Sequence, residues 1–199
     1  MFTGLILGTG KLVSKQLLED FAKLKIEYPT SFPPLQLGDS ISVNGVCLTI
    51  SDIDHSSNHF DVDVMGITLS LTNMLDITDG SIVNLELAMA IGDRFGGHLV
   101  QGHIDGKSQL LDITEHSDWS TFRFSLDSSI AKYVVLKGSI CLNGVSLTVS
   151  GVGEDWFEVS LIPTTLNLTN FGEMNVGSLV NVEVDLIAKY VESMLKDRK

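Results

Sequence analysis

Apolar and polar residues alternate with a period of two in several short segments of the chain. The alternation is clearest in residues 23–28, 59–65 and 82–87, which predicts a β-strand in each. Asn44-Gly45 stands between two apolar runs, a pair typical of a tight β-hairpin turn. Because turn residues recur about every 8–12 positions, the pattern favours an antiparallel structure built from short strands.

The pattern is less regular near the N-terminus. Residues 2–7 are predicted to form a strand, and residues 8–11 a turn or bulge after it. The glycines here do not make a phosphate-binding loop, because their spacing is wrong and Leu12 stands where Ser or Thr would bind magnesium. Residues 13–21 are compatible with a short helix, and residues 68–74 with a short helix or a loop.

The chain contains the same pattern twice. Residues 38–50 return about one hundred residues later as residues 137–149. The matched residues are Asn44-Gly45-Val46 with Asn143-Gly144-Val145, Cys47 with Ser146, Ser42 with Cys141, Thr49 with Thr148, Asn73 with Asn170, Asn84 with Asn181, Glu86 with Glu183, and Gly4-Leu5-Ile6 with Gly102-His103-Ile104. A solenoid or propeller has shorter units, of about 20–50 residues. The repeat therefore predicts a tandem duplication of one module.

Six short strands per module with almost no helix predict a closed barrel. The fold class is all-β: two tandem six-stranded antiparallel barrels of the Greek-key type, plus a C-terminal α-helix. The predicted domains are residues 1–96 and 97–186, followed by a helix at residues 187–199. One face of the C-terminal helix is apolar, so we expect this helix to mediate oligomerisation. The face consists of Leu186, Tyr190, Val191, Met194 and Leu195.

Composition and charge narrow the range of partners. The formal charge of −12 argues against nucleic acid, since neutralising phosphates requires clustered Lys and Arg. The sequence has no signal peptide and no run of about 20 apolar residues, which predicts a cytoplasmic protein without a membrane partner. Two cysteines, Cys47 and Cys141, are too few for a disulfide framework or a zinc site. They occupy different positions of the repeat, so no bridge between them is expected.

Cys47 and its counterpart Ser146 lie inside the repeated motif, each followed by Leu and Thr. One interpretation is a small side chain that packs, buried, against the next strand. The other is a thiol and hydroxyls, including Thr49 and Thr148, that line a pocket at a barrel mouth and act in proton transfer or addition. The spacing alone leaves both interpretations open.

The glycine-rich segment 96–106 contains His98 and His103. His103 matches Leu5 in the repeat, so it belongs to one module only, which indicates a task that the first copy lacks. The HxxxxH spacing argues against zinc, because no further ligand converges and the two side chains would point to opposite faces of an alternating strand. No metal is therefore predicted.

Six motifs, in order along the chain, together resemble the riboflavin synthase family of lumazine-binding double-barrel proteins. They are MFTG (residues 1–4), NGVCLT (44–49), GGHLVQGHIDG (96–106), KGSI (137–140), NGVSLT (143–148) and LIP (161–163). Any one of these motifs is weak, but together they cover essentially the whole chain. The resemblance implies two barrels related by pseudo-twofold symmetry, a homotrimer built by the C-terminal helix, and no cofactor.

The resemblance also implies a reaction. In this family two molecules of 6,7-dimethyl-8-ribityllumazine react, and a four-carbon unit moves from one to the other. The products are riboflavin and 5-amino-6-(D-ribitylamino)uracil. The implied active site lies between the N-terminal barrel of one subunit and the C-terminal barrel of its neighbour. The implied partner is this small-molecule substrate, and an association with lumazine synthase stays open.

Catalytic roles are implied for Ser40, Cys47, His103 and Thr148, with His103 as the proton carrier and Cys47 polarising or adding to the lumazine ring. The implied substrate-binding residues form two sets. The first set is Phe2, Gly4, Leu5, Ile6, Cys47, Leu48, Thr49, Asp63, Val64, Met65, Gly66, Ile67 and Thr68. The second set is Gly102, His103, Ile104, Lys137, Ser146, Leu147, Thr148, Ile162, Pro163, Thr164, Thr165, Leu166 and Asn167.

Two positions depart from the family pattern. Ile67 stands where the first barrel usually has Glu, and Thr164 stands where Glu or His is common in the second. Both lie in segments implied to hold the ribityl chain. They raise an alternative, similarity to the lumazine proteins, which share the double barrel but bind a lumazine or flavin without catalysis. Those proteins have lost the equivalents of Cys47 and His103, and this chain keeps both, so the resemblance favours the enzyme.

Overall fold

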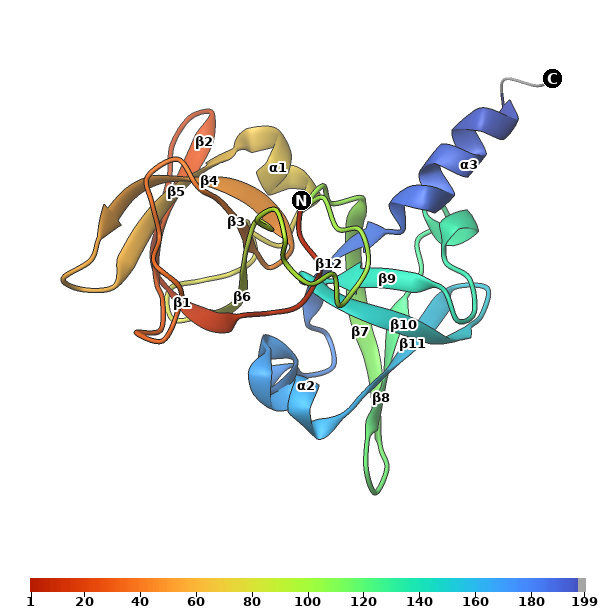
Figure 1. Ribbon diagram of the computed structural model, residues 1–199. Helices are drawn as coiled ribbons and strands as arrows, with labels where there is room; N and C mark the ends of the chain where they lie inside the picture. Colours follow the sequence, from red (N-terminus) through yellow and green to blue (C-terminus); the bar gives the residue numbers. More distant parts are fainter. Residues whose placement is uncertain (197–199) are drawn as a thin grey trace.

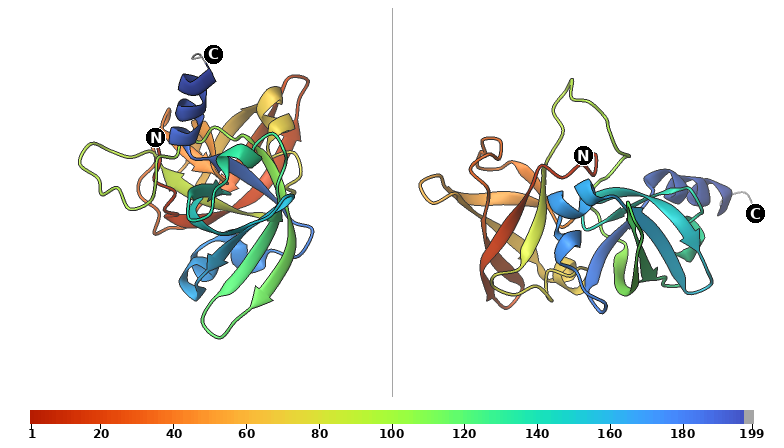
Figure 2. Two further views of the ribbon diagram at one scale, coloured as in Figure 1. Left: turned by 90° about the vertical axis from the view of Figure 1, so that its right-hand side faces the viewer. Right: turned by 90° about the horizontal axis from the view of Figure 1, so that it is seen from below.

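The protein forms two closed six-stranded antiparallel barrels that lie side by side (Figures 1 and 2), as a computed structural model of residues 1–196 shows. The first barrel consists of β1 (Gly8–Leu17), β2 (Phe21–Glu27), β3 (Ser40–Val43), β4 (Val46–Asp54), β5 (His59–Met65) and β6 (Ile82–Leu87). Its strands follow the order β1-β2-β5-β4-β3-β6 around the barrel. Hydrogen bonds between β1 and β6 close it.

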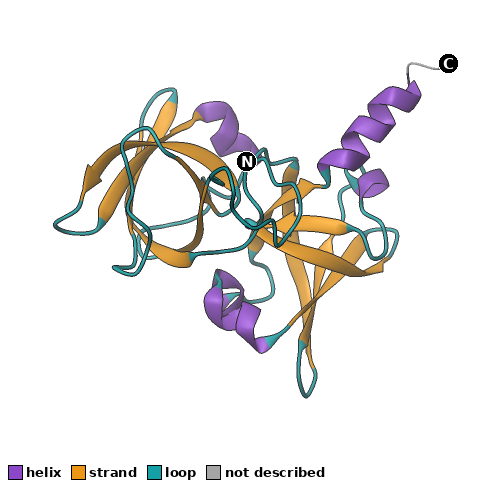
Figure 3. Ribbon diagram, viewed as in Figure 1, coloured by secondary structure: helices purple, strands orange, loops and turns teal. Residues whose placement is uncertain are grey.

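The second barrel repeats this topology. It consists of β7 (Gly106–Glu115), β8 (Ser120–Ser125), β9 (Ser139–Leu142), β10 (Val145–Val152), β11 (Trp156–Leu161) and β12 (Leu179–Val184). The order around the closed barrel, β7-β8-β11-β10-β9-β12, is the same as in the first. Helices are short and lie outside the barrels (Figure 3): α1 (Gly66–Leu71), α2 (Pro163–Leu168), α3 (Leu186–Lys196) and the 3₁₀ turns η1 (Ala131–Tyr133) and η2 (Asn170–Glu173). The all-β double-barrel fold and the duplication are confirmed.

Each barrel is filled by apolar side chains that alternate inward along the strands. In β2 the fully buried residues are Ala22, Leu24 and Ile26. Phe124 and Phe157 stack in the second barrel with ring centroids 5.6 Å apart. The interiors are therefore solid cores rather than ligand cavities, and any binding site has to lie outside them.

The two predicted hairpin turns meet between the barrels. Asn44 and Gly45 join β3 to β4 with φ of 46° and 81°, and Asn143 and Gly144 join β9 to β10 with φ of 45° and 82°. Two consecutive positive φ values define the type I′ hairpin, for which Asn-Gly is the favoured pair. A Cβ on Gly45 would lie 2.7 Å from the backbone nitrogen of Gly144, so the turns approach each other as closely as they do only because both carry glycine.

The N-terminal prediction was wrong in its details. Residues 2–7 contain only an isolated bridge at Phe2, and the strand begins at Gly8, where a turn was expected. Residues 13–21 do not form a helix, because β1 runs to Leu17 and pairs with β2. A bulge between Leu12 and Ser14 breaks the alternation of β1, which explains why its period was misleading.

Two extended segments cross between the barrels. We call residues 3–6 the first strap and residues 101–104 the second strap. Just before the straps begin, Phe2 and Val100 form an antiparallel bridge, in which each backbone N–H donates to the other's carbonyl oxygen, at 2.8 and 3.3 Å. Each strap precedes one barrel in the sequence but contacts the other: Ile6 packs on the core of the second barrel, and Ile104 on that of the first. This exchange cannot be read from the repeat.

Six asparagines hold the two barrels together. They are Asn44, Asn73, Asn84, Asn143, Asn170 and Asn181, three equivalent pairs of the repeat, and all are buried. The side chain of Asn84 donates to the carbonyl oxygen of Asn143 at 2.9 Å, and that of Asn181 donates to the carbonyl oxygen of Asn44 at 2.8 Å. The pairing is reciprocal, as a pseudo-twofold axis requires. Buried amides bonded to each other in this way fix the relative orientation of the barrels.

Helix α3 leaves the second barrel and points away from both (Figure 1). Its polar side is fixed to the barrel by ion pairs of Lys189 with Asp105 at 2.7 Å and of Glu192 with Lys132. Its apolar side is open: Ile187, Tyr190, Val191, Met194 and Leu195 each expose half or more of their surface. The predicted helix thus exists over residues 186–196, and residues 197–199 of the prediction lie outside the described part of the chain. None of the helices within residues 1–196 is long and apolar enough to cross a membrane.

Candidate active site

The predicted residues of the first barrel gather on its outer face, at the edge formed by β3 and β4. Along β4 the side chains of Val46, Leu48 and Ile50 point into the core, so Cys47 and Thr49 point outward. Ser40 pairs with Thr49 across the two strands. These side chains therefore lie at a surface site beside the second strap, and not in a pocket at a barrel mouth.

The second strap brings His103 to the first barrel within a single chain. The backbone N–H of Cys47 donates to the carbonyl oxygen of Gly102 at 3.0 Å. Gly102 has φ of +81°, and a Cβ there would lie 2.5 Å from the Cβ of Cys47, so the close approach requires glycine. The resemblance implied an active site between the barrels of two subunits, which could use Cys47 of the first barrel and His103 of the second. In the structure their segments already adjoin in one chain, because the straps cross.

The environment of Cys47 controls its protonation. Burial of the half-exposed thiol raises its pKa, and the negative charge of Glu183 acts in the same direction. The positive charge of the N-terminus and a hydrogen bond with Ser40 lower this pKa and partly offset the burial. The thiol is therefore the main form at neutral pH, suited to donating a hydrogen bond or a proton rather than to acting as a free thiolate.

Two buried glutamates anchor the straps, one on each side. Glu183 on β12 accepts the backbone N–H groups of Gln101, Gly102 and His103 at 2.7, 2.8 and 3.1 Å. Glu86 on β6 accepts those of residues 3 and 4 at 2.7 and 3.0 Å. Burial raises the pKa of both carboxyl groups, and the backbone hydrogen bonds oppose that shift.

The second barrel has the equivalent site, and here it forms a cavity of about 180 Å³. The lining residues come from the first strap, β10 and α2: Gly4, Leu5, Ile6, Val145, Ser146, Leu147, Thr164, Thr165, Leu168 and Thr169. The backbone N–H of Ser146 donates to the carbonyl oxygen of Gly4 at 2.8 Å, the counterpart of the bond between Cys47 and Gly102. Small-molecule pockets usually measure about 300–1,000 Å³. The cavity thus has room for part of a ligand of that size.

His98 contacts Ser146, one of the residues that line this cavity. Its ring Nδ1 lies 2.6 Å from the Ser146 hydroxyl oxygen. Burial lowers the pKa of His98, and the charge of Asp185 opposes that shift, so the ring is neutral at physiological pH. In the sequence, zinc binding was the one role weighed for His98, and the spacing argued against it. The segment is not a strand, and His98 faces a hydroxyl.

The predicted catalytic and substrate-binding residues divide into three locations. On or beside the first barrel's outer face lie Ser40, Cys47, Thr49, Asp63, Met65, Gly66, Ile67, Thr68, Gly102, His103 and Ile104. On or beside the second lie Gly4, Leu5, Ile6, Lys137, Ser146, Leu147, Thr148, Ile162, Pro163, Thr164, Thr165, Leu166 and Asn167. Phe2, Leu48 and Val64 are buried in cores, where they support the sites without exposing side chains to a ligand. Each site therefore combines one barrel with the strap that precedes the other.

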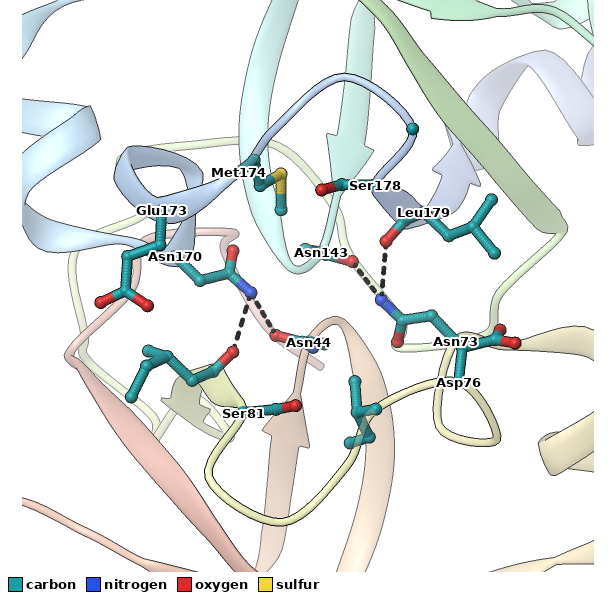
Figure 4. A pocket seen from close by; sticks show the side chains of 13 residues that line it. Asn44, Asn73, Asp76, Ser81, Asn143, Asn170, Glu173, Met174, Ser178 and Leu179 are labelled. Atoms are coloured by element: carbon teal, nitrogen blue, oxygen red, sulfur yellow. Dashed lines mark hydrogen bonds between the residues drawn. The ribbon is translucent and has the colours of Figure 1, made fainter.

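A larger hollow between the barrels is not where these residues gather. It measures about 420 Å³ and is lined by Asn44, Asn73, Asn143, Asn170 and residues of the neighbouring turns (Figure 4). The amides of Asn73 and Asn170 are directed at Asn143 and Asn44 at 3.2 and 3.1 Å (Figure 4). The hollow is thus the surface of the joint that connects the barrels.

Three site features were missed in the sequence. Glu86 and Glu183 were visible as repeat partners in the middle of strands, and an acidic residue in an otherwise apolar strand is a signal for a buried anchor. The contact of His98 with Ser146 had no local signal, because it depends on the path of the straps.

Comparison with known proteins agrees with the repeat. The sequence model of the family described as "Lumazine binding domain" matches residues 3–88 and again residues 101–185. The chain is 47% identical over 199 residues to the riboflavin synthase of Mycobacterium tuberculosis, covering 98% of each chain. It is 46% identical over 195 residues to that of Bacillus subtilis, covering 98% of this chain and 90% of that one.

Solved structures with the same architecture include LumP complexed with riboflavin, with a TM-score of 0.86 and 25% identity over 92% of this chain and 99% of that one. LumP complexed with 6,7-dimethyl-8-(1'-D-ribityl) lumazine has a TM-score of 0.83 at 24% identity, again over 92% of this chain and 99% of that one. This second match shows that the two proteins share a fold. The family model matches both halves of the chain, and the identity to known riboflavin synthases is 46–47% over nearly the full length. Together these findings show the family. The chain belongs to the lumazine-binding-domain family, and it is a member of the riboflavin synthase group within it.

Proposed function

We propose that this chain catalyses the riboflavin synthase reaction. Two molecules of 6,7-dimethyl-8-ribityllumazine react, one donating four carbons and the other accepting them, to give riboflavin and 5-amino-6-(D-ribitylamino)uracil. Donor and acceptor are the same compound, so the exchange balances without an external oxidant or reductant. The observation that carries the proposal is the contact between the Cys47 segment and the Gly102-His103 strap, which unites the two residues that distinguish the enzymes from the lumazine proteins.

The site of reaction is proposed to combine the first barrel of one subunit with the second barrel of its neighbour. Thr148, the fourth predicted catalytic residue, lies on the outer face of the second barrel of the same chain, and Ser40, Cys47 and His103 lie on or beside the first. The cavity of about 180 Å³ beside Ser146 is small for a lumazine with its ribityl chain, so a second protein surface is expected to complete it.

The assembly is proposed to be a homotrimer held by α3. Its exposed apolar stripe supports this, because five large apolar side chains in one short helix are costly to leave in water. Closed symmetry is the usual form of a homo-oligomer. We also propose that this trimer is cytoplasmic.

His103 is proposed to carry protons at the reacting ring, and Cys47 with the nearby hydroxyls to polarise or add to it. Holding two copies of one heterocycle in a fixed, antiparallel stack removes much of the entropic cost of their encounter, an effect that reaches about 7–11 kcal/mol in well-oriented systems. Positioning is therefore expected to contribute more to the rate than any single side chain.

The direct experiment is to mix the purified protein with 6,7-dimethyl-8-ribityllumazine and follow riboflavin by absorbance. Sustained turnover beyond one equivalent per site supports the synthase. The likeness to LumP complexed with riboflavin raises one alternative, a lumazine or flavin carrier. Tight binding of the lumazine without riboflavin formation would mean that the departures at Ile67 and Thr164 have made the barrel a ligand carrier.

A further inference from the structure

Ser146 and Cys47 occupy equivalent positions of the two barrels but have different neighbours. Cys47 interacts with Ser40 on the adjacent strand. Ser146 instead has the ring of His98 at 2.6 Å from its hydroxyl oxygen. A hydroxyl rotates freely about its C–O bond unless a partner fixes it. The two sites therefore differ in the side chain that contacts this position, which is His98 in the second barrel only.

The backbone around His98 brings its ring to this place. The N–H of His98 donates to the carbonyl oxygen of Thr3 at 3.2 Å. A Cβ on the preceding Gly97 would lie 1.9 Å from that carbonyl oxygen and 3.1 Å from the Ser146 hydroxyl. Only glycine lets the segment pass this close to the first strap. Ser146 is held in turn by its own backbone bond to Gly4.

The neutral imidazole of His98 has one donor and one acceptor nitrogen, so Nδ1 makes a directed bond with the Ser146 hydroxyl in either tautomer. Ser146 also lines the cavity, together with Leu5 and Thr165. We propose that His98 is a positioning residue, which orients the Ser146 hydroxyl toward a polar edge of the lumazine ring held at the second barrel. This inference rests on the proposed lumazine-binding function.

The test compares four variants with the wild type: His98→Leu, His98→Asn, Ser146→Ala and the double variant His98→Leu/Ser146→Ala. The Asn side chain places an amide atom close to the position of Nδ1, and Leu has a similar size without a polar atom. We expect His98→Leu to lower kcat/KM for 6,7-dimethyl-8-ribityllumazine about 10-fold, the usual effect of losing one hydrogen bond of about 1.4 kcal/mol. His98→Asn should recover it to within about 3-fold.

The double variant distinguishes positioning from a general structural role. If His98 acts through Ser146, then His98→Leu in the Ser146→Ala background changes kcat/KM by less than about 2-fold. The inference would be overturned if the effects of His98→Leu and Ser146→Ala on kcat/KM multiply in the double variant. It would also be overturned if His98→Leu has the kinetics of the wild type. If His98→Leu does not fold, judged by its melting temperature, His98→Gln takes its place, because its amide lies near Nε2 and misses Ser146.

The outcome is separable from that of the proposed function. Riboflavin binding, followed by quenching of its fluorescence, is measured on the same variants and does not require turnover. If the wild type makes no riboflavin but His98→Leu weakens riboflavin binding and His98→Asn restores it, the positioning role stands and the catalytic function fails. If the wild type turns over and none of the His98 variants differs from it, the function stands and the positioning role fails.

Discussion

The backbone N–H of Cys47 donates a hydrogen bond to the carbonyl oxygen of Gly102 at 3.0 Å, although the two residues belong to different modules of the repeat. The equivalent bond joins Ser146 to Gly4. Each barrel is therefore contacted by the strap that precedes the other barrel in the sequence. This exchange places a cysteine beside the only strap that carries a histidine, His103.

We expect Cys47→Ser to lower the turnover number at least about 10-fold, which corresponds to ~1.4 kcal/mol of transition-state stabilisation. The hydroxyl keeps the size of the side chain but lacks the acidity and polarisability of the thiol. Riboflavin affinity should change by less than about 3-fold, since the packing is kept. Steady-state kinetics and fluorescence titration measure the two quantities. The control is Cys141→Ser, which alters the other, fully buried thiol; a full-rate Cys47→Ser enzyme would remove the thiol from the mechanism.

Gly102→Ala should lower the free energy of unfolding more than a glycine-to-alanine change at a site without a steric conflict. Gly38 has φ of +87° with nothing within 4 Å of its Cβ position, so Gly38→Ala carries only the backbone strain, about 1–2 kcal/mol. Gly102→Ala adds a collision with Cys47 and is expected to cost about 1–3 kcal/mol more in the free energy of unfolding. Urea denaturation of both variants measures the difference. Equal losses would show that the strap moves away at no cost.

Asn84→Ala should lower the free energy of unfolding by about 2–4 kcal/mol, because it leaves the buried backbone N–H of Asn170 and the carbonyl oxygen of Asn143 without their partner. Asn181→Ala, the equivalent change on the other side, is expected to cost about as much. Asn175→Ala, on the exposed loop, is the control and should stay within about 0.5 kcal/mol of the wild type. If Asn84→Ala lowers the free energy of unfolding no more than Asn175→Ala does, the asparagine network does not hold the two barrels together.

Glu183 should make stability fall with rising pH. Its folded-state pKa is raised above the ordinary 4.5, so between that value and the raised one the folded state binds more protons than the unfolded state. The free energy of unfolding then decreases as pH rises through this window, by at most about 1.4 kcal/mol per pH unit for one group.

The measurement is the difference in free energy of unfolding between the wild type and Glu183→Gln, followed by urea denaturation from about pH 4 to pH 8. This difference should fall as pH rises, and Glu86→Gln should behave in the same way because burial raises that pKa too. The exposed Glu19→Gln is the control. A pH-independent difference would show that burial does not raise the pKa of either carboxyl group above its unfolded-state value.

Val191→Glu should dissociate the proposed trimer. Val191 lies in the apolar stripe of α3, and burying such a side chain contributes about 1.5–3 kcal/mol, so its loss raises the dissociation constant by about 10-fold to 150-fold. Sedimentation velocity measures the assembly state, and turnover should fall with it if the site is shared between subunits. Ser193→Glu adds the same charge outside the stripe and should leave the assembly intact. A monomeric wild-type protein would refute the trimer directly.

The sequence by itself determined the architecture. Alternation along residues 23–28 and 59–65 predicted strands that the structure contains, since period two is a property of local backbone geometry. The Asn-Gly pairs predicted type I′ turns because few residues adopt positive φ. The repeat predicted two equal barrels. These features depend on neighbours along the chain, and a single sequence contains them.

Only the tertiary structure decided how the halves combine. The strand β1 replaced an expected turn and helix because pairing with β2 and β6 outweighs the weak local preference of residues 8–17. The crossing straps, the partner of each buried glutamate and the contact of His98 with Ser146 join residues many positions apart. Chain periodicity carries no information about such contacts, since they arise from burying apolar surface between modules and from satisfying the polar groups trapped there.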